Sequence, residues 1–151
     1  MSLLLFPEGE YFAIGAINYA YRPPITNDTN RIIIGVYVED IITEAVLDTG
    51  APYPIISPKI AKQAGLNRVK PLEKTKMVVR KMKLEGSIIR LNMTLTAGKG
   101  KDLTVNATAF IPDSEECWGD FPCFIGQIGF LERIRYAVDP ANDTFYFGQL
   151  S

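Results

Sequence analysis

Two apolar segments that lead directly into an acidic tripeptide constrain this chain more than any other feature. Residues 32–38 and 41–47 are rich in β-branched side chains, which favour strands. Two acidic residues separate the segments and supply a turn. The pattern predicts a β-hairpin whose second strand runs straight into Asp-Thr-Gly at 48–50.

Strand patterns continue along the rest of the chain. Residues 77–97 and 103–111 read as strands. Residues 136–138 and 144–147 predict a closing hairpin around a turn of Pro, Asn and Asp. With 151 residues, 47% of them hydrophobic, the chain is long enough to bury one sizeable core. We expect a mostly β domain without internal repeats.

Helix signals are few and short. Ser57 is a candidate N-cap, Pro58 suits the first helical position, and Gly65 is a stop signal. Residues 130–135 are a second candidate. The sequence therefore predicts one or two short helices beside the strands.

Composition narrows the possible chemistry. Histidine is absent, which excludes Ser-His-Asp catalysis, Cys-His catalysis and His-ligated zinc. Carboxylate acid/base catalysis, carboxylate-bound Mg²⁺ or Ca²⁺, and Lys or Tyr chemistry remain. Cys117 and Cys123 cannot complete a zinc site alone, and we expect reduced thiols, with a local disulfide as the alternative. No metal or cofactor is expected.

The N-terminal sequence gives no sign of export. Its apolar run covers four residues, with no basic residue before it, which is far shorter than a signal peptide core or a membrane span. We therefore expect a cytoplasmic protein without a membrane partner.

Charge is unevenly distributed along the chain. The formal net charge is −1, yet residues 59–101 contain 12 Lys and Arg against 2 Asp and Glu. A solvated face balanced by acidic neighbours is one interpretation. A basic rim that attracts acidic polypeptide or a phosphate backbone is the other. No aromatic residue lies between Tyr53 and Phe110 to stack on bases, so a nucleic-acid partner is not expected.

Asp48 is the candidate catalytic residue. Apolar segments flank it on both sides, and a carboxylate enclosed in this way is costly unless it has a partner or a role. Gly50 allows close approach of the backbone, and Thr49 offers a hydroxyl that does not titrate. An ordinary Asp-x-Gly turn is the alternative interpretation.

Four ordered elements carry a family resemblance. They are the hairpin 32–47, the loop Asp48-Thr49-Gly50-Ala51, the segment 55–66 that opens a helix and ends in Ala-Gly-Leu, and Phe124-Ile125-Gly126 followed by the closing hairpin. In this respect the chain resembles the retropepsin-like aspartic proteases over roughly residues 31 to 150. The resemblance implies a closed-barrel-like acid-protease domain at 31–151. Residues 1–30 have no counterpart and are expected to form an N-terminal arm or added strand.

The chain departs from the family pattern at three places. Between residues 66 and 97, where the flap is expected, the only glycine is Gly86. The spacing from Gly126 to Phe130 is one residue longer than in the family, which predicts a bulge before the second helix. Pro52 and Pro54 stiffen the chain after the loop.

The resemblance implies peptide hydrolysis by two aspartates that share one proton. No second Asp-Ser/Thr-Gly occurs, so activity requires a homodimer in which two copies of Asp48 meet on the two-fold axis. Thr49 and Gly50 would stabilise the paired loops and Ala51 would line the groove. The strand 144–147 is expected to expose aromatic side chains that the partner covers.

The flap candidates predict substrate preference. If residues 77–97 cover the groove, Arg80, Lys81, Lys83 and Arg90 lie on or near the lid, and Gly86 is a further flap candidate. Acidic residues near a scissile bond between apolar residues should then be favoured. The sequence thus predicts an aspartic endopeptidase acting on polypeptides. A non-catalytic binding or dimerisation module of the same fold and a nucleic-acid-associated protein are the alternatives.

Overall fold

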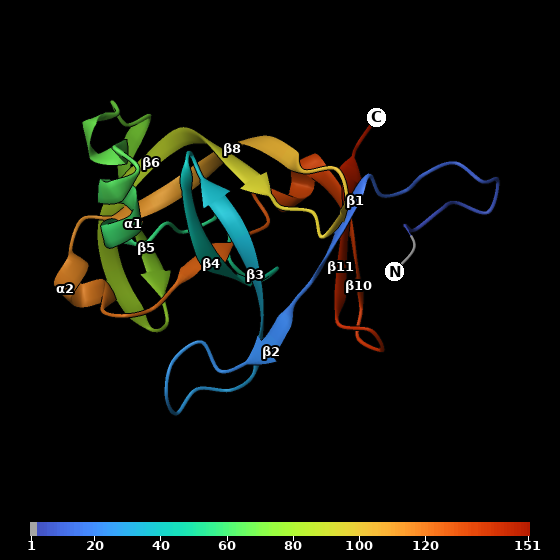
Figure 1. Cartoon of the computed structure of the whole chain (residues 1–151). Helices are drawn as coiled ribbons and strands as arrows, with labels where there is room; N and C mark the ends of the chain where they lie inside the picture. Colours follow the sequence, from blue (N-terminus) through green and yellow to red (C-terminus); the bar gives the residue numbers. More distant parts are fainter. Residues whose placement is uncertain (1–2) are drawn as a thin grey trace.

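The computed structural model describes residues 3–151, and the chain is mostly β as predicted (Figure 1). Met1 and Ser2, at the start of the predicted arm, lie outside the described residues. The strands are β1 (Gly15–Asn18), β2 (Ala20–Arg22), β3 (Arg31–Val38), β4 (Ile41–Leu47), β5 (Glu73–Val79), β6 (Met82–Leu95), β7 (Lys99–Gly100), β8 (Leu103–Pro112), β9 (Cys123–Ile125), β10 (Ile134–Asp139) and β11 (Thr144–Gln149). The helices are α1 (Pro58–Gln63) and α2 (Glu115–Trp118), with 3-10 turns η1 (Leu66–Arg68) and η2 (Leu131–Arg133).

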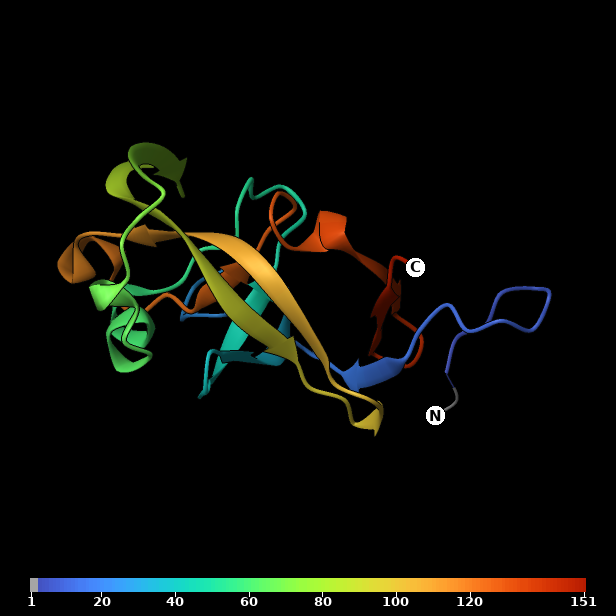
Figure 2. The same ribbon diagram turned by 90° about the horizontal axis from the view of Figure 1, so that it is seen from above.

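The strands form two open sheets. The larger has the order β5-β6-β3-β4-β9, with β2 paired to β3 and β8 paired to β6, and the smaller has the order β10-β11-β1-β7. Neither sheet closes on itself, so the expected closed barrel describes the arrangement only loosely. Figure 2 shows β6 and β8 running side by side from the end of the molecule that carries α1 to the end that carries β1.

Both predicted hairpins are confirmed. Strands β3 and β4 pair from Val38 and Ile41 at the turn to Ile33 and Val46 at the far end. Strands β10 and β11 pair around a turn at residues 140–143. Alternating apolar residues of both hairpins fill the core, because successive side chains of a strand point to opposite faces.

The first predicted helix is also confirmed. Helix α1 begins with Pro58, and the Ser57 hydroxyl accepts a hydrogen bond from the backbone N–H of Ile60 at 3.3 Å. Gly65, just beyond its end, has a φ of 75°, the left-handed conformation that glycine adopts without strain.

Replacing Ser57 with Ala is expected to lower the free energy of unfolding by about 1 kcal/mol, because the Ile60 N–H loses its acceptor. Urea denaturation measures the change. The matched control is Thr104→Ala on the exposed face of β8, whose hydroxyl bonds only to that of Thr94 and should matter less. An equal loss in both variants would contradict the capping role.

The second predicted helix is mostly absent. Only residues 131–133 are helical, as the single 3-10 turn η2, and residues 134 and 135 already belong to β10. The alternation of Ile134, Tyr136 and Val138 fits a strand, and pairing with β11 outweighs helix propensity. The predicted bulge before it is present. Gly129 has a φ of 86°, and the N–H of Glu132 reaches back to the carbonyl of Gln127 at 3.0 Å.

The expectation that the C-terminal strand exposes aromatic side chains for a partner is wrong, because N-terminal residues cover it. Strand β1 pairs with β11 along its whole length, so β11 lies between β10 and β1 inside one chain. Phe145 and Phe147 are completely buried, and Thr144 is 2% exposed. Phe145 and Phe147, which were expected to await a partner, are therefore covered by the chain itself, and Tyr146 is half-buried. Truncation after Asn142 would remove part of the core, not only a dimer contact.

The two cysteines differ in their exposure. Both cysteines are free, with Cys117 exposed and Cys123 buried. Burial raises the pKa of the Cys123 thiol, because desolvation disfavours the thiolate. No helix in residues 3–151 is both long and apolar enough to span a membrane.

Candidate active site

Parallel pairing of β4 with β9 places Asp48. Val46 lies beside Phe124 and Leu47 beside Ile125 in the two strands. The ladder continues one residue further, where the backbone N–H of Asp48 donates to the carbonyl of Ile125 at 3.0 Å. The segment 124–126 therefore packs directly behind the Asp48 loop.

The Asp48 loop is a tight turn that bonds to its own carboxylate. The N–H of Gly50 donates to Asp48 Oδ1 at 2.9 Å, and the N–H of Ala51 donates to the Asp48 carbonyl at 3.1 Å. Ala51 is buried, whereas Thr49 and Gly50 are exposed. The Asp48 side chain is 31% exposed, so the flanking apolar segments enclose it only partly within one chain.

Gly126 permits the close packing behind this loop. A Cβ atom at this position would lie 2.4 Å from the Tyr53 carbonyl oxygen and 2.8 Å from the Ala51 carbonyl oxygen. Both contacts are with backbone atoms, which cannot rotate away as a side chain would. The absence of a side chain at residue 126 is therefore a condition for the position of the Asp48 loop.

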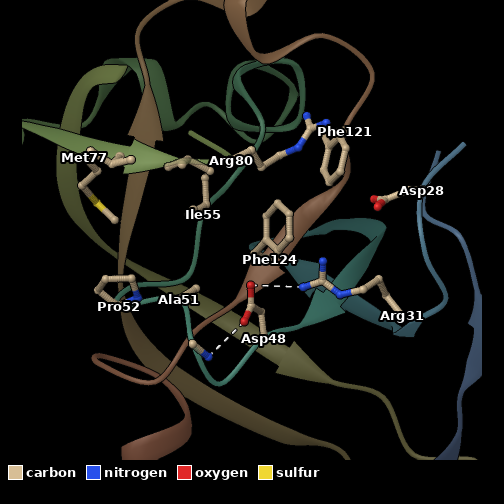
Figure 3. Close-up of a pocket in the computed structure, with 13 residues that line it drawn as sticks. Asp28, Arg31, Asp48, Ala51, Pro52, Ile55, Met77, Arg80, Phe121 and Phe124 are labelled. Atoms are coloured by element: carbon tan, nitrogen blue, oxygen red, sulfur yellow. Dashed lines mark hydrogen bonds and ion pairs between the residues drawn. The ribbon is translucent and has the colours of Figure 1, made fainter. Parts of the chain in front are cut away.

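Asp48 lies in a cleft of about 320 Å³ between its loop and the β5–β6 hairpin (Figure 3). The predicted residues Asp48, Gly50, Ala51 and Arg80 line this cleft. Thr49, Lys81, Lys83 and Gly86 are not among its lining residues. The complete lining is Asp28, Arg31, Asp48, Gly50, Ala51, Pro52, Ile55, Met77, Val78, Val79, Arg80, Phe121 and Phe124.

Gly86 lies in the ladder rather than at the tip of the hairpin. It pairs with Thr75 of β5 and Pro112 of β8, and a Cβ atom there would lie 2.3 Å from the carbonyl oxygen of Ile111. Glycine at this position allows close packing of strands. The hairpin turns instead at Arg80 and Lys81, with φ values of 52° and 67°. Two left-handed residues that are not glycine therefore form the tight turn at the tip of this hairpin.

Arg31 contacts the candidate catalytic carboxylate, a role that could not be predicted from the sequence. Its guanidinium lies 3.2 Å from Asp48 Oδ2, with both side chains about 30% exposed. It also approaches the ring of Phe124, at 6.0 Å from the centroid. The sequence feature that could have drawn attention to Arg31 is its place as the first residue of an apolar strand. Its partner lies 17 residues away and is set by hairpin register.

An aromatic cluster lies beside the cleft, which Phe121 and Phe124 line. The rings of Trp118, Phe121 and Phe124 contact one another, and the Trp118 indole N–H donates to the Phe121 carbonyl at 2.8 Å. The unpredicted helix α2 carries Trp118. The sequence pattern that could have predicted α2 is Ser114 followed by two glutamates. The Ser114 hydroxyl caps the helix by accepting from the Cys117 N–H at 3.1 Å.

The acidic side chains do not gather around a metal site. No group of three or more Cys, Asp or Glu residues within residues 3–151 is arranged to hold an ion. In the cleft, Asp28 and Asp48 lie on either side of Arg31 (Figure 3).

Known structures resemble this arrangement, although no protein-family model and no curated protein sequence matches the chain. A retropepsin-like aspartic protease from Rickettsia conorii superposes with a TM-score of 0.56 and 20% identity, covering 90% of this chain and 94% of that one. The fold is therefore retropepsin-like. The retroviral protease-like domain of Ddi1 from Leishmania major superposes with a TM-score of 0.52 and 16% identity, covering 80% of this chain and 94% of the other.

Elements expected from the family resemblance can be located in the retropepsin-like fold. The β5–β6 hairpin, which covers Asp48, is the element expected as the flap. The β4–β9 ladder and the Asp48 loop are the elements on which the sequence resemblance was based. The Arg31–Asp48 ion pair and the Arg80-Lys81 turn were not among the elements of that resemblance.

Proposed function

We propose that the chain is a homodimeric aspartic endopeptidase in which the two Asp48 carboxylates activate a water molecule for attack on a peptide bond. The observation that carries the proposal is the position of Asp48. Its carboxylate is held by the Gly50 N–H in a cleft that the β5–β6 hairpin covers. A cleft of about 320 Å³ whose lining combines charged residues with apolar ones, among them Ile55, Val79 and Phe124, can accept a large side chain of a peptide.

The chemistry follows from the pairing of two acids. Two carboxylates a few Å apart cannot both ionise easily, so one proton is shared between them. The ionised carboxylate takes a proton from water as the oxygen attacks the carbonyl carbon, while the protonated one donates to the carbonyl oxygen. Collapse of the tetrahedral intermediate breaks the C–N bond, and the amine leaves with a proton from the dyad. No cofactor enters the reaction.

The second carboxylate would come from another copy of the chain. Asp28 is the other acid of the cleft, but it lies beyond Arg31 and outside an Asp-Thr-Gly turn. Thr49 and Gly50 are exposed, and so is Ile128, whose N–H is bonded to the neighbouring Pro52 carbonyl. These residues would form the central contact of the dimer. Because β1 already covers β11, the partner's termini would not take that place.

A mixing experiment tests the shared site. Adding a ninefold excess of Asp48→Asn chains to the wild type, with time for subunit exchange, is expected to reduce peptide hydrolysis per wild-type chain to roughly a tenth, because most wild-type chains then occupy mixed dimers. Sedimentation velocity checks that the dimers form. The control is the same excess of Asp40→Asn chains, which retain Asp48, so that hydrolysis per chain should stay close to that of the wild type. Unchanged activity with proven exchange would show that one Asp48 suffices and would overturn the shared-site mechanism.

A non-catalytic peptide-binding module is a second candidate. The observation that favours it is the ion pair of Asp48 with Arg31 within one chain, which occupies the carboxylate that would activate water. Binding of a labelled unfolded polypeptide without any turnover by the wild type would support this candidate.

By contrast, parts of the basic region are balanced within the chain, since Lys74 pairs with Asp113 and Lys76 with Glu85. This balance gives no support to a nucleic-acid partner.

A further inference from the structure

The turn of the β5–β6 hairpin points one arginine into the cleft and leaves its neighbour outside. Val79 and Met82 are the last paired residues, so Arg80 and Lys81 form the two-residue turn between them. Arg80 lines the cleft, whereas Lys81 does not. Two adjacent cations in the same left-handed conformation therefore differ in position relative to the cleft.

The Arg80 side chain is held in one orientation. Its guanidinium carbon lies 3.3 Å from the centroid of the Phe121 ring (Figure 3). Stacking on an aromatic face fixes the plane of the guanidinium and leaves the N–H donors, which lie in that plane, directed away from the ring. The turn residue is thus an oriented hydrogen-bond donor rather than a freely moving surface charge.

Arg80 has no anionic partner among residues 3–151. Lys74, Lys76 and Arg31 each form an ion pair with a carboxylate of the chain, whereas Arg80 forms neither an ion pair nor a side-chain hydrogen bond. Within the cleft, Asp48 is already paired with Arg31. Asp28, the other acid of the cleft, accepts from the Thr29 N–H at 2.8 Å and forms no ion pair with Arg80. The donors of Arg80 are therefore free to bind an incoming group.

We propose that Arg80 determines specificity by binding a carboxylate of the peptide substrate, so that the cleft prefers peptides with Asp or Glu close to the apolar residue at the scissile bond. This inference rests on the proposed endopeptidase function. The guanidinium fork matches a carboxylate with two parallel N–H···O bonds. Ile55, Val79 and Phe124 line the same cleft and favour an apolar neighbour.

The test compares kcat/KM for paired peptides that differ only in Glu or Gln at each position around an apolar scissile pair, with both ends blocked. For the wild type we expect a Glu preference of about 3- to 10-fold at one position, since an oriented charged hydrogen bond exceeds an ordinary surface pair. Arg80→Gln should reduce this ratio to near one, and Arg80→Lys should give an intermediate value. Lys81→Gln, with the same change in charge, should leave the ratio unchanged.

Three results would overturn the inference. They are a Glu preference that survives Arg80→Gln, an equal loss in Lys81→Gln, and no Glu preference in the wild type. A second set of peptides with a free C-terminus tests whether the bound carboxylate is the chain end. A preference for free over blocked C-termini that is lost in Arg80→Gln would show that Arg80 binds the chain-end carboxylate, which overturns the proposed preference for Asp and Glu side chains. Thermal denaturation checks that both Gln variants are folded.

A binding measurement separates this inference from the proposed function. Fluorescence anisotropy of labelled Glu and Gln peptides is measured with Asp48→Asn chains and with chains that also carry Arg80→Gln. Tighter binding of the Glu peptide that disappears with Arg80→Gln supports the carboxylate site even if the wild type hydrolyses nothing. Equal binding of both peptides overturns the carboxylate site even if the wild type is an active protease.

Discussion

Replacing Asp48 with Asn is expected to lower kcat/KM for peptide hydrolysis by about 10³- to 10⁴-fold, because an amide can neither take a proton from water nor share one with a second carboxylate. The change is nearly isosteric. In the wild type the Gly50 N–H donates to Asp48 Oδ1 at 2.9 Å, and the side-chain oxygen of Asn can still accept this bond. The fold should therefore persist, and steady-state assays on an unfolded polypeptide measure the loss directly.

The matched control is Asp40→Asn, at the opposite end of the same hairpin. Asp40 is exposed in the β3–β4 turn and lies outside the cleft lining. It carries the same charge as Asp48, and its removal should leave hydrolysis within about twofold of the wild type. Equal rates for Asp48→Asn and the wild type would refute the catalytic role of Asp48.

Replacing Gly126 with Ala is expected to lower the free energy of unfolding by about 1 to 3 kcal/mol, because the new methyl group collides with backbone and the structure must shift to admit it. The shift falls on the Ala51 carbonyl, at the end of the turn that holds Asp48, and on the Tyr53 carbonyl two residues further along. Since misplacement of a catalytic group by about 1 Å can cost 10²-fold in rate, we expect hydrolysis to fall by at least that factor.

Gly35→Ala provides the comparison for Gly126→Ala. Gly35 lies in β3, and the nearest atom to a Cβ there is the Thr96 hydroxyl oxygen at 3.9 Å, an ordinary contact. Chemical denaturation and activity should both remain close to wild type. If Gly126→Ala were as stable and active as Gly35→Ala, the close packing behind the Asp48 loop would not matter for the site.

Local patterns explain why much of the fold could be predicted. The β3–β4 hairpin, the Asp48 turn and the Ser57 cap of α1 depend on residues that are near one another in sequence. Strand propensity, turn chemistry and capping act over such short separations. The expected second helix was wrong for the converse reason. Ile134 and its neighbours pair with β11, and that tertiary contact overrides a weak helical signal.

For the same reason, only part of the candidate site could be predicted from the sequence. Asp48 and its loop could be recognised in the sequence, because the carboxylate and its Gly50 donor are two residues apart. Arg31 and the Phe121 that orients Arg80 could not, since these contacts depend on strand register and on a wall built around α2. Pairing of β1 with β11 joins the two ends of the chain. The sequence by itself thus determined the strand-rich class and the acidic turn, while only the tertiary structure decided what faces that turn, because contacts between distant segments depend on register and packing rather than on local propensity.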